Sequence, residues 1–188
     1  WWLPALAQVD AEQVLAIGRN VLSMDDYMLS IQYFNQAIKA KPYLADPYFF
    51  RALAKLELED YKGAEEDCTA AIERNKFKTE SYKLRGFARQ YLGRNREAID
   101  DYDVGLLHNP SDKYFLYYKS VAQTELKDYS GADSTFAVLL RHYPRFDEGL
   151  GARARLNALR GDTAAAITDL DKAIETSPSS LQPYLLRA

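Results

Sequence analysis

The side chains that most often carry catalysis or bind metals are few in this sequence of 188 residues. Its two histidines, His108 and His142, are too far apart to form a metal-ligand pair on one helix or loop. Its single cysteine, Cys68, excludes an internal disulfide and a cysteine-based metal cluster. The sequence has no HExxH motif, no phosphate-binding loop and no catalytic-triad pattern. These residues predict neither an enzyme nor a bound metal or cofactor.

One glycine pattern resembles a nucleotide-binding motif. The segment Gly149-Leu150-Gly151-Ala152-Arg153-Ala154 has the glycine spacing of dinucleotide sites. Those sites also need a strand before the glycines and a βαβ unit around them. The surrounding sequence has helical spacing instead, so we expect this segment to lie within a helix that its two glycines weaken.

The charge balance limits the class of partner. Charged residues make up 27% of the chain, and the formal net charge is −3 at pH 7. A nucleic acid partner is not expected, because a phosphate backbone attracts a clear basic excess. Basic side chains gather between Arg141 and Arg160, where Arg155 is a candidate contact for a carboxylate or phosphate, although such groups more often form a solvated face. No apolar run reaches the roughly 18–20 residues of a membrane span.

The first ten residues have a composition of their own. Trp1-Trp2-Leu3-Pro4-Ala5-Leu6-Ala7 is apolar and ends in small residues, as does the end of a secretory signal before its cleavage site. The basic region of such a signal is missing, so an apolar arm over residues 1–10 is the alternative. Export to a bacterial periplasm or cell envelope is slightly favoured over a cytoplasmic location.

Four prolines reveal an internal repeat. Pro42, Pro110, Pro144 and Pro178 are separated by 68, 34 and 34 residues, and Lys76 stands at the midpoint of the double gap. A period of 34 residues therefore runs from residue 11 to residue 180. The period predicts five units, which are residues 11–44, 45–78, 79–112, 113–146 and 147–180. A sixth unit begins at residue 181 and is cut off at residue 188, so we expect the natural protein to continue.

Two positions of the repeat hold small side chains throughout. Position 8 is Gly18, Ala52, Gly86, Ser120, Ala154 and Ala188, and position 20 is Ser30, Ala64, Ala98, Ala132 and Ala166. Two helices approach closely only where side chains are short, so these positions predict the crossing of two helices, A and B, in each unit. Aspartate and glycine residues between the two positions predict the turns.

Together with an aromatic residue near position 24 and proline at position 32, this pattern resembles the tetratricopeptide repeat over residues 11–188. The resemblance implies an all-α fold, a right-handed superhelical α-solenoid of antiparallel helix hairpins. It also implies eleven helices, with B helices beginning near residues 26, 61, 95, 129 and 163. The chain looks like a fragment of a bacterial, exported member of this family.

Charged residues recur at two positions that face the interior of the hairpin. Arginine at position 7 accompanies aspartate at position 23 in three units: Arg51 with Asp67, Arg85 with Asp101, and Arg153 with Asp169. An unpaired buried charge is costly, so we expect structural ion pairs rather than chemistry, with each arginine contacting an aspartate at position 23 of its own unit or of the preceding one. Acidic pairs such as Glu65-Glu66 are expected on the outer face of the B helices instead.

The family resemblance implies a concave groove lined by positions 2, 5, 6, 9 and 13 of the A helices, which helical spacing places together. In the second to fourth units these positions are mostly aromatic or apolar. The candidate binding residues are Phe49, Phe50, Leu53, Lys83, Leu84, Phe87, Tyr91, Tyr117, Tyr118 and Val121. Exposed apolar patches on soluble proteins mark interaction surfaces. The carboxylate clamp of some family members does not fit, because its Lys and Asn positions are occupied otherwise.

The groove predicts a protein-interaction scaffold that binds a peptide or helix of another protein. Two alternatives stay open from the sequence. The rings could simply pack against neighbouring helices. The chain could also be a structural spacer or assembly arm of a larger or self-associating protein, with the groove filled by its own chain or by a second copy.

Overall fold

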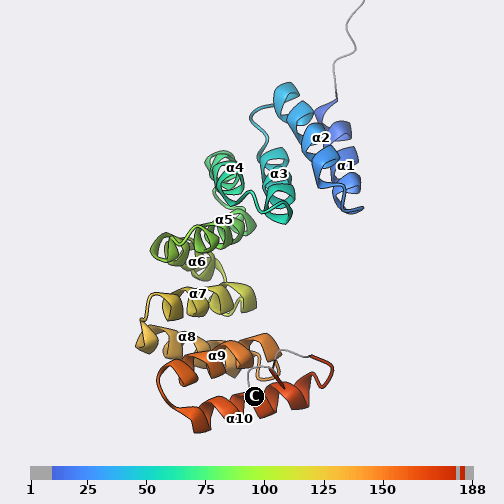
Figure 1. Cartoon of the computed structure of the whole chain (residues 1–188). Helices are drawn as coiled ribbons and strands as arrows, with labels where there is room; N and C mark the ends of the chain where they lie inside the picture. The colour runs from blue at the N-terminus through green and yellow to red at the C-terminus, as the bar shows by residue number, and fades with distance from the viewer. Residues whose placement is uncertain (1–9, 181–182, 185–188) are drawn as a thin grey trace, which may run out of the picture. The chain divides into compact units, whose positions relative to one another are not determined.

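The computed structural model describes residues 10–180 and 183–184, which form ten α-helices and no strand (Figure 1). The helices are α1 (Ala11–Leu22), α2 (Tyr27–Ala40), α3 (Ala45–Glu57), α4 (Tyr61–Arg74), α5 (Thr79–Tyr91), α6 (Asn95–His108), α7 (Lys113–Glu125), α8 (Tyr129–His142), α9 (Asp147–Leu159) and α10 (Thr163–Thr176). The all-α class is confirmed. The predicted arm or signal remnant over residues 1–10 and the predicted eleventh helix after residue 180 lie almost entirely outside the described residues.

The even-numbered helices begin within one residue of the predicted positions, because local turn chemistry fixes their starts. Aspartate caps four of them; for example, Asp60 accepts a hydrogen bond from the Gly63 amide at 2.9 Å, and Asp128 accepts one from the Gly131 amide at 3.0 Å. The residue before the cap position turns the chain with a positive φ, whether it is glycine, as at Gly161, or not, as at Lys127. This turn returns the chain antiparallel to the preceding helix.

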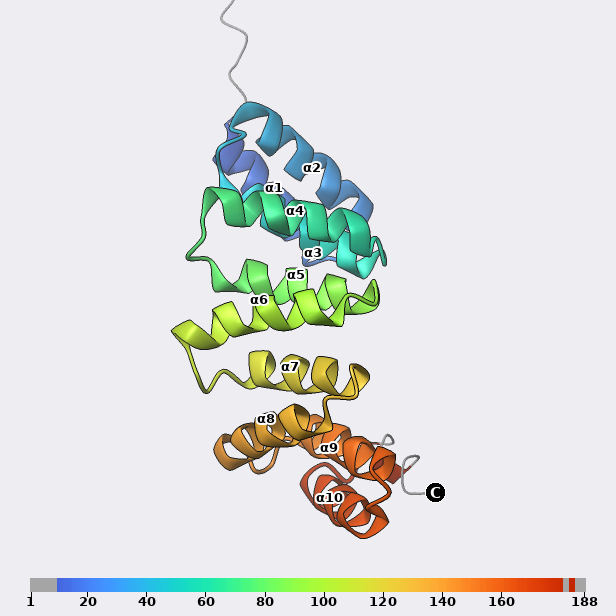
Figure 2. The same ribbon diagram turned by 90° about the vertical axis from the view of Figure 1, so that its left-hand side faces the viewer.

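The helices divide into two compact bodies, Trp1–Gly93 and Arg94–Ala188, and each is described by itself. In the N-terminal body, α1 pairs with α2 and α3 with α4, and each pair packs on the helix that follows it. In the C-terminal body, successive helices from α6 to α10 pack side by side in the same manner (Figure 2). The division falls inside the predicted third unit, and the predicted unit boundaries stay a prediction.

Small residues sit where the helices of a hairpin cross. In the N-terminal body Ala52 of α3 and Ala64 of α4 are fully buried in one cluster with Cys68. In the C-terminal body Ala154, Ala166 and Leu170 form the matching cluster between α9 and α10. Any larger side chain at these positions would separate the two helices, so the predicted crossing points are present in both bodies.

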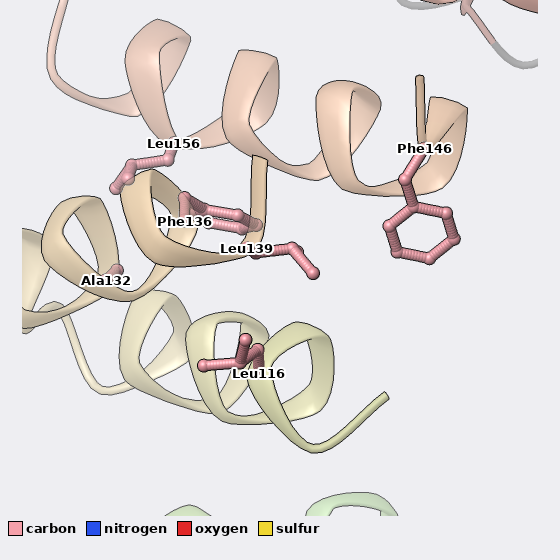
Figure 3. Close-up of a cluster of buried hydrophobic side chains, with 6 residues drawn as sticks. All are labelled: Leu116, Ala132, Phe136, Leu139, Phe146 and Leu156. Carbon is pink, nitrogen blue, oxygen red and sulfur yellow. The ribbon is translucent and has the colours of Figure 1, made fainter. Parts of the chain in front are cut away.

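Larger side chains bury the faces between successive hairpins. Figure 3 shows Phe136 and Leu139 of α8 lying between Leu116 of α7 and Leu156 of α9, with Phe146 at the start of α9. Phe136, Leu139 and Leu156 are completely buried. Each hairpin therefore buries its apolar face on its neighbour, as in other stacked repeats.

The interior carboxylates are paired. Asp67 of α4 is buried and accepts a hydrogen bond from Arg51 Nε at 2.8 Å, with Lys55 Nζ also 2.8 Å away. Asp169 of α10 accepts one from Arg153 Nε at 2.8 Å and one from the Asn157 amide at 3.2 Å. These two predicted ion pairs are confirmed, and the pair of Arg85 with Asp101 stays a prediction.

The same repeat position also reaches the preceding hairpin, although its partner there is not the residue at position 23. Arg51 donates a hydrogen bond to Asn35 Oδ1 at 2.5 Å, on a helix 16 residues earlier in the chain. Lys119 of α7 likewise donates to Asp103 Oδ1 of α6 at 2.5 Å, again 16 residues earlier. In these two cases the side chain at position 7 ties an A helix to the B helix before it.

Glu65 corrects the prediction of an outward-facing acidic pair. Its carboxylate lies 3.0 Å from Arg89 Nε of α5, and only 15% of its side chain is exposed. Its neighbour Glu66 is exposed, as predicted. The two residues differ because Glu65 faces the following A helix, whereas Glu66, one residue further around α4, faces solvent.

Adding one methyl group tests the close packing. A Cβ at Gly105 would overlap the ring of the buried Phe115, so we expect Gly105→Ala to destabilise the protein by about 1–3 kcal/mol. A Cβ at Gly151 meets nothing within 4 Å, so Gly151→Ala should stabilise it by about 0.5–1 kcal/mol through helix propensity. Urea unfolding followed by circular dichroism measures both, and equal effects would contradict the packing.

Removing a carboxylate tests the interior pairs. Asp169→Ala leaves Arg153 and Asn157 without their shared acceptor, and we expect a loss of about 3 kcal/mol in unfolding free energy. Asp133→Ala is the control, because Asp133 forms an exposed pair with Arg160 at 3.7 Å. Its removal should cost less than about 1 kcal/mol. A similar cost for both variants would show that burial does not strengthen the interior pair.

Candidate binding surfaces

The ten candidate groove residues are all accessible to some extent. None of them is buried, nine are half-buried, and Tyr91 is 59% exposed. They fall into two sets because the chain divides into two bodies. The N-terminal set is Phe49, Phe50 and Leu53 on α3 with Lys83, Leu84, Phe87 and Tyr91 on α5; the C-terminal set is Tyr117, Tyr118 and Val121 on α7. Their partial exposure is a condition for binding and leaves the binding itself a prediction.

The rings of the N-terminal set pack on one another and on the framework. Phe50 lies 6.0 Å from the ring of Phe34 in a stacked arrangement and 5.1 Å from Phe49 edge to face. Tyr91 stacks on Tyr61 at 4.5 Å. Neighbouring rings hold these side chains in place, so a partner would meet a preorganised surface rather than mobile rings.

Cations flank the rings of the N-terminal set. The guanidinium of Arg19 lies 4.8 Å from the centre of the Phe50 ring, and Lys78 Nζ lies 4.2 Å from that of Phe49. Lys78 also forms an ion pair with Asp46 at 2.6 Å. Cation–π contacts of this kind fix the position of a charge above an aromatic face. Positive charges therefore lie beside the rings of the N-terminal set.

The C-terminal body contains a pocket of about 380 Å³ between α7 and α9. Tyr117 and Val121 of α7 line one side, and Phe136 of α8 contributes to the lining. Gly151 and Ala152 of α9 line the opposite side, and Ser180 and Pro183 complete it. One repeat earlier in the chain, Gly151 and Ala152 correspond to Tyr117 and Tyr118. The space exists because two small residues stand where that repeat carries rings.

This pocket was not predicted from the sequence. The two glycines were expected to weaken their helix, and α9 runs unbroken from Asp147 to Leu159. Tyr117 and Val121, two of the predicted groove residues, do line the pocket. Tyr118 stacks at 5.9 Å on Tyr102 of α6. The sequence does contain a signal for this pocket, because the residues at positions 5 and 6 are small in the last complete unit.

Charged groups surround the pocket. Glu125 and Arg155 form an ion pair at 2.9 Å across it, and Asp147 and Glu148 lie at the start of α9. A hydrogen bond with Glu148 lowers the pKa of the Asp147 carboxyl below its usual value. Burial, and then the hydrogen bond with Asp147, raises the pKa of Glu148. Arg155 as an anion contact stays a prediction, and its acidic neighbours count against it.

An NMR titration of carboxyl carbons tests the Asp147–Glu148 pair. In the wild-type chain the pKa of Glu148 should lie above its ordinary value and that of Asp147 below it. Asp147→Asn removes a neighbouring negative charge, so the pKa of Glu148 should fall. Asp133→Asn, which removes a carboxylate of α8 that pairs with Arg160, should leave it unchanged. A Glu148 titration that is the same in both variants would contradict the pairing.

Within the described part of the chain, no three His, Cys, Asp or Glu side chains are grouped as metal ligands would be. None of the described helices has the length and apolar character needed to cross a membrane. The candidate chemistry of the described surfaces is therefore that of aromatic, apolar and charged contacts.

Comparison with known proteins places this geometry in a family. Residues 45–77 match the family model described as "Tetratricopeptide repeat". The chain also superimposes on the solved structure of YrrB, described as a TPR protein with an unusual peptide-binding site. The TM-score is 0.78 at 16% identity, over 94% of this chain and 91% of that one. Residues 45–77 are therefore a tetratricopeptide repeat, and the chain has the fold of tetratricopeptide-repeat proteins.

Two curated relatives share part of the sequence. The "Translocon at the outer membrane of chloroplasts 64" of Pisum sativum is 40% identical over 96 residues, which are 51% of this chain and 16% of that protein. "Serine/threonine-protein phosphatase 5" of Rattus norvegicus is 34% identical over 103 residues, 55% of this chain and 21% of that protein. The chain thus spans about a fifth or less of either relative. The tetratricopeptide-repeat fold implies a protein-interaction scaffold.

Proposed function

We propose that this tetratricopeptide-repeat chain binds a peptide or helix of a partner protein on the aromatic side chains of its A helices. The observation that carries the proposal is that none of the ten groove residues is buried, although eight of them have large aliphatic or aromatic side chains. Rings that only filled the interior would be inaccessible, as Phe34 and Phe136 are. Aromatic residues are enriched among those that dominate binding energy at protein interfaces.

Two further observations support a peptide as the ligand. YrrB, which has the same fold over nearly its whole length, is described as having an unusual peptide-binding site. The rings of Phe49, Phe50 and Phe87 also contact neighbouring rings within 5.1 Å, so they need little ordering on binding. Peptides that lie in a preformed aromatic groove gain affinity mainly by burying apolar side chains there.

Selection from a random twelve-residue peptide display library tests the proposal. Peptides that bind the N-terminal set should lose about 5–150-fold in affinity for Phe50→Ala, and peptides that bind the C-terminal set should lose as much for Tyr118→Ala. This corresponds to roughly 1–3 kcal/mol for an aromatic residue central to an interface. Isothermal titration calorimetry with the selected peptides measures the change. Thermal unfolding of each variant shows whether it keeps the fold.

Phe77→Ala is the matched control. Phe77 is 72% exposed in the loop between α4 and α5, and its ring contacts Lys76 rather than the groove. The same Phe-to-Ala change there should leave affinity unchanged. If no peptide is selected, or if Phe77→Ala costs as much as Phe50→Ala, the groove is not the binding surface. Dimers seen by light scattering and abolished by Phe50→Ala would instead favour a groove filled by a second copy.

A further inference from the structure

The pocket between α7 and α9 combines two kinds of wall. Its interior is formed by the ring of Tyr117, the side chain of Val121 and the buried ring of Phe136. Its rim carries the carboxylates of Glu125, Asp147 and Glu148. A volume of about 380 Å³ is within the range of roughly 300–1,000 Å³ that is typical of ligand pockets. An occupant must therefore be apolar along its stem and polar at its end.

The charge of the rim selects the sign of that polar end. Three carboxylates face one guanidinium in the pocket, and Arg155 is already paired with Glu125 at 2.9 Å. Asp147 and Glu148 are consecutive residues in the first turn of α9, and hydrogen bonding with Glu148 and with Ser177 lowers the pKa of Asp147. Lys113 of α7 acts on Glu148 only through its charge. Two adjacent carboxylates repel when both are ionised, and a cation between them relieves that repulsion.

We propose that this pocket receives the side chain of an arginine or lysine from the partner peptide. The aliphatic stem lies against Tyr117 and Val121, and the charged head reaches Asp147 and Glu148. Long basic side chains bury their methylene groups on apolar surface in this way while the head stays with polar partners. Charge-assisted hydrogen bonds to carboxylates then hold the head in place. The inference rests on the proposed function and narrows it, for the C-terminal body, to partners with a basic residue.

A small probe tests this without knowledge of the partner. N-acetyl-arginine amide is titrated into the ¹⁵N-labelled 188-residue chain, and amide shifts are followed by two-dimensional NMR. The shifts should saturate in the millimolar range and be centred on Val121, Gly151 and Ala152. N-acetyl-citrulline amide has the same shape without the charge, and it should bind at least about tenfold more weakly, as the loss of a charge-assisted hydrogen bond predicts. Equal binding of the two probes, or shifts elsewhere on the protein, would overturn the proposal.

Variants of α9 locate the binding. A side chain added at Gly151 enters open space, so Gly151→Leu should fill the pocket without disturbing the helix and weaken the arginine probe at least about tenfold. Ala158→Leu adds the same bulk to an exposed position of α9 and should have no effect. Glu148→Gln should weaken binding, whereas Asp133→Asn on α8 should not. Binding that survives Gly151→Leu places the probe outside the pocket and rejects the inference.

The outcomes separate this inference from the proposed function. If arginine amide does not bind but library peptides bind and depend on Phe50, the scaffold binds peptides and the basic-residue pocket is wrong. If library selection yields no peptide but arginine amide binds and Gly151→Leu abolishes it, the pocket is right and the aromatic groove fails. Library peptides that contain arginine or lysine and lose affinity with Gly151→Leu would support both.

Discussion

The structure depends on the close approach of two helices at a pair of small side chains. Ala52 and Ala64 in one hairpin, and Ala154 and Ala166 in another, are almost completely buried where the helices meet. Short side chains at the crossing let the larger residues beside it, such as Cys68 and Leu170, fill the remaining space. One face of each hairpin is then left uncovered, and burying it requires the next hairpin. The 34-residue period of the sequence arises because every hairpin has this same requirement.

Buried charges add specificity to this packing. Asp67 and Asp169 are 3% and 2% exposed, and an unpaired carboxylate at such positions would cost several kcal/mol. The fourth unit has Thr135 where these units have an aspartate, and the Thr135 hydroxyl donates a hydrogen bond to Gln123 Oε1 at 2.7 Å. A neutral pair thus takes the place of the charged one. Charge and partner change together in these three units, so the polar side chain at position 23 keeps a hydrogen-bond partner. These pairs stabilise one register of A on B, because sliding either helix by one turn would separate donor from acceptor.

Features that depend on local chemistry could be predicted from the sequence. Helix starts follow from caps such as Asp60 and Asp128, and the pair of Arg51 with Asp67 follows from two interior positions of one hairpin. Contacts from one hairpin to the next could not be predicted in the same way. The bonds of Lys119 to Asp103, and of Arg89 to Glu65, depend on how an A helix rests on the preceding B helix, which the spacing within one unit does not contain.

The candidate site shows the same division. Its residue types were predictable, because helical spacing places positions 5, 6 and 9 on one face of each A helix, where Leu84, Tyr117 and Tyr118 also pack against the core. The pocket was not predictable, because small residues create it. Gly151 and Ala152 take the places that Tyr117 and Tyr118 occupy in the preceding repeat. A small residue in the sequence indicates a pocket only when the structure shows which residues surround it. The side chains that these surfaces offer therefore differ from repeat to repeat, with cations beside the rings of α3 and carboxylates around the pocket beside α9.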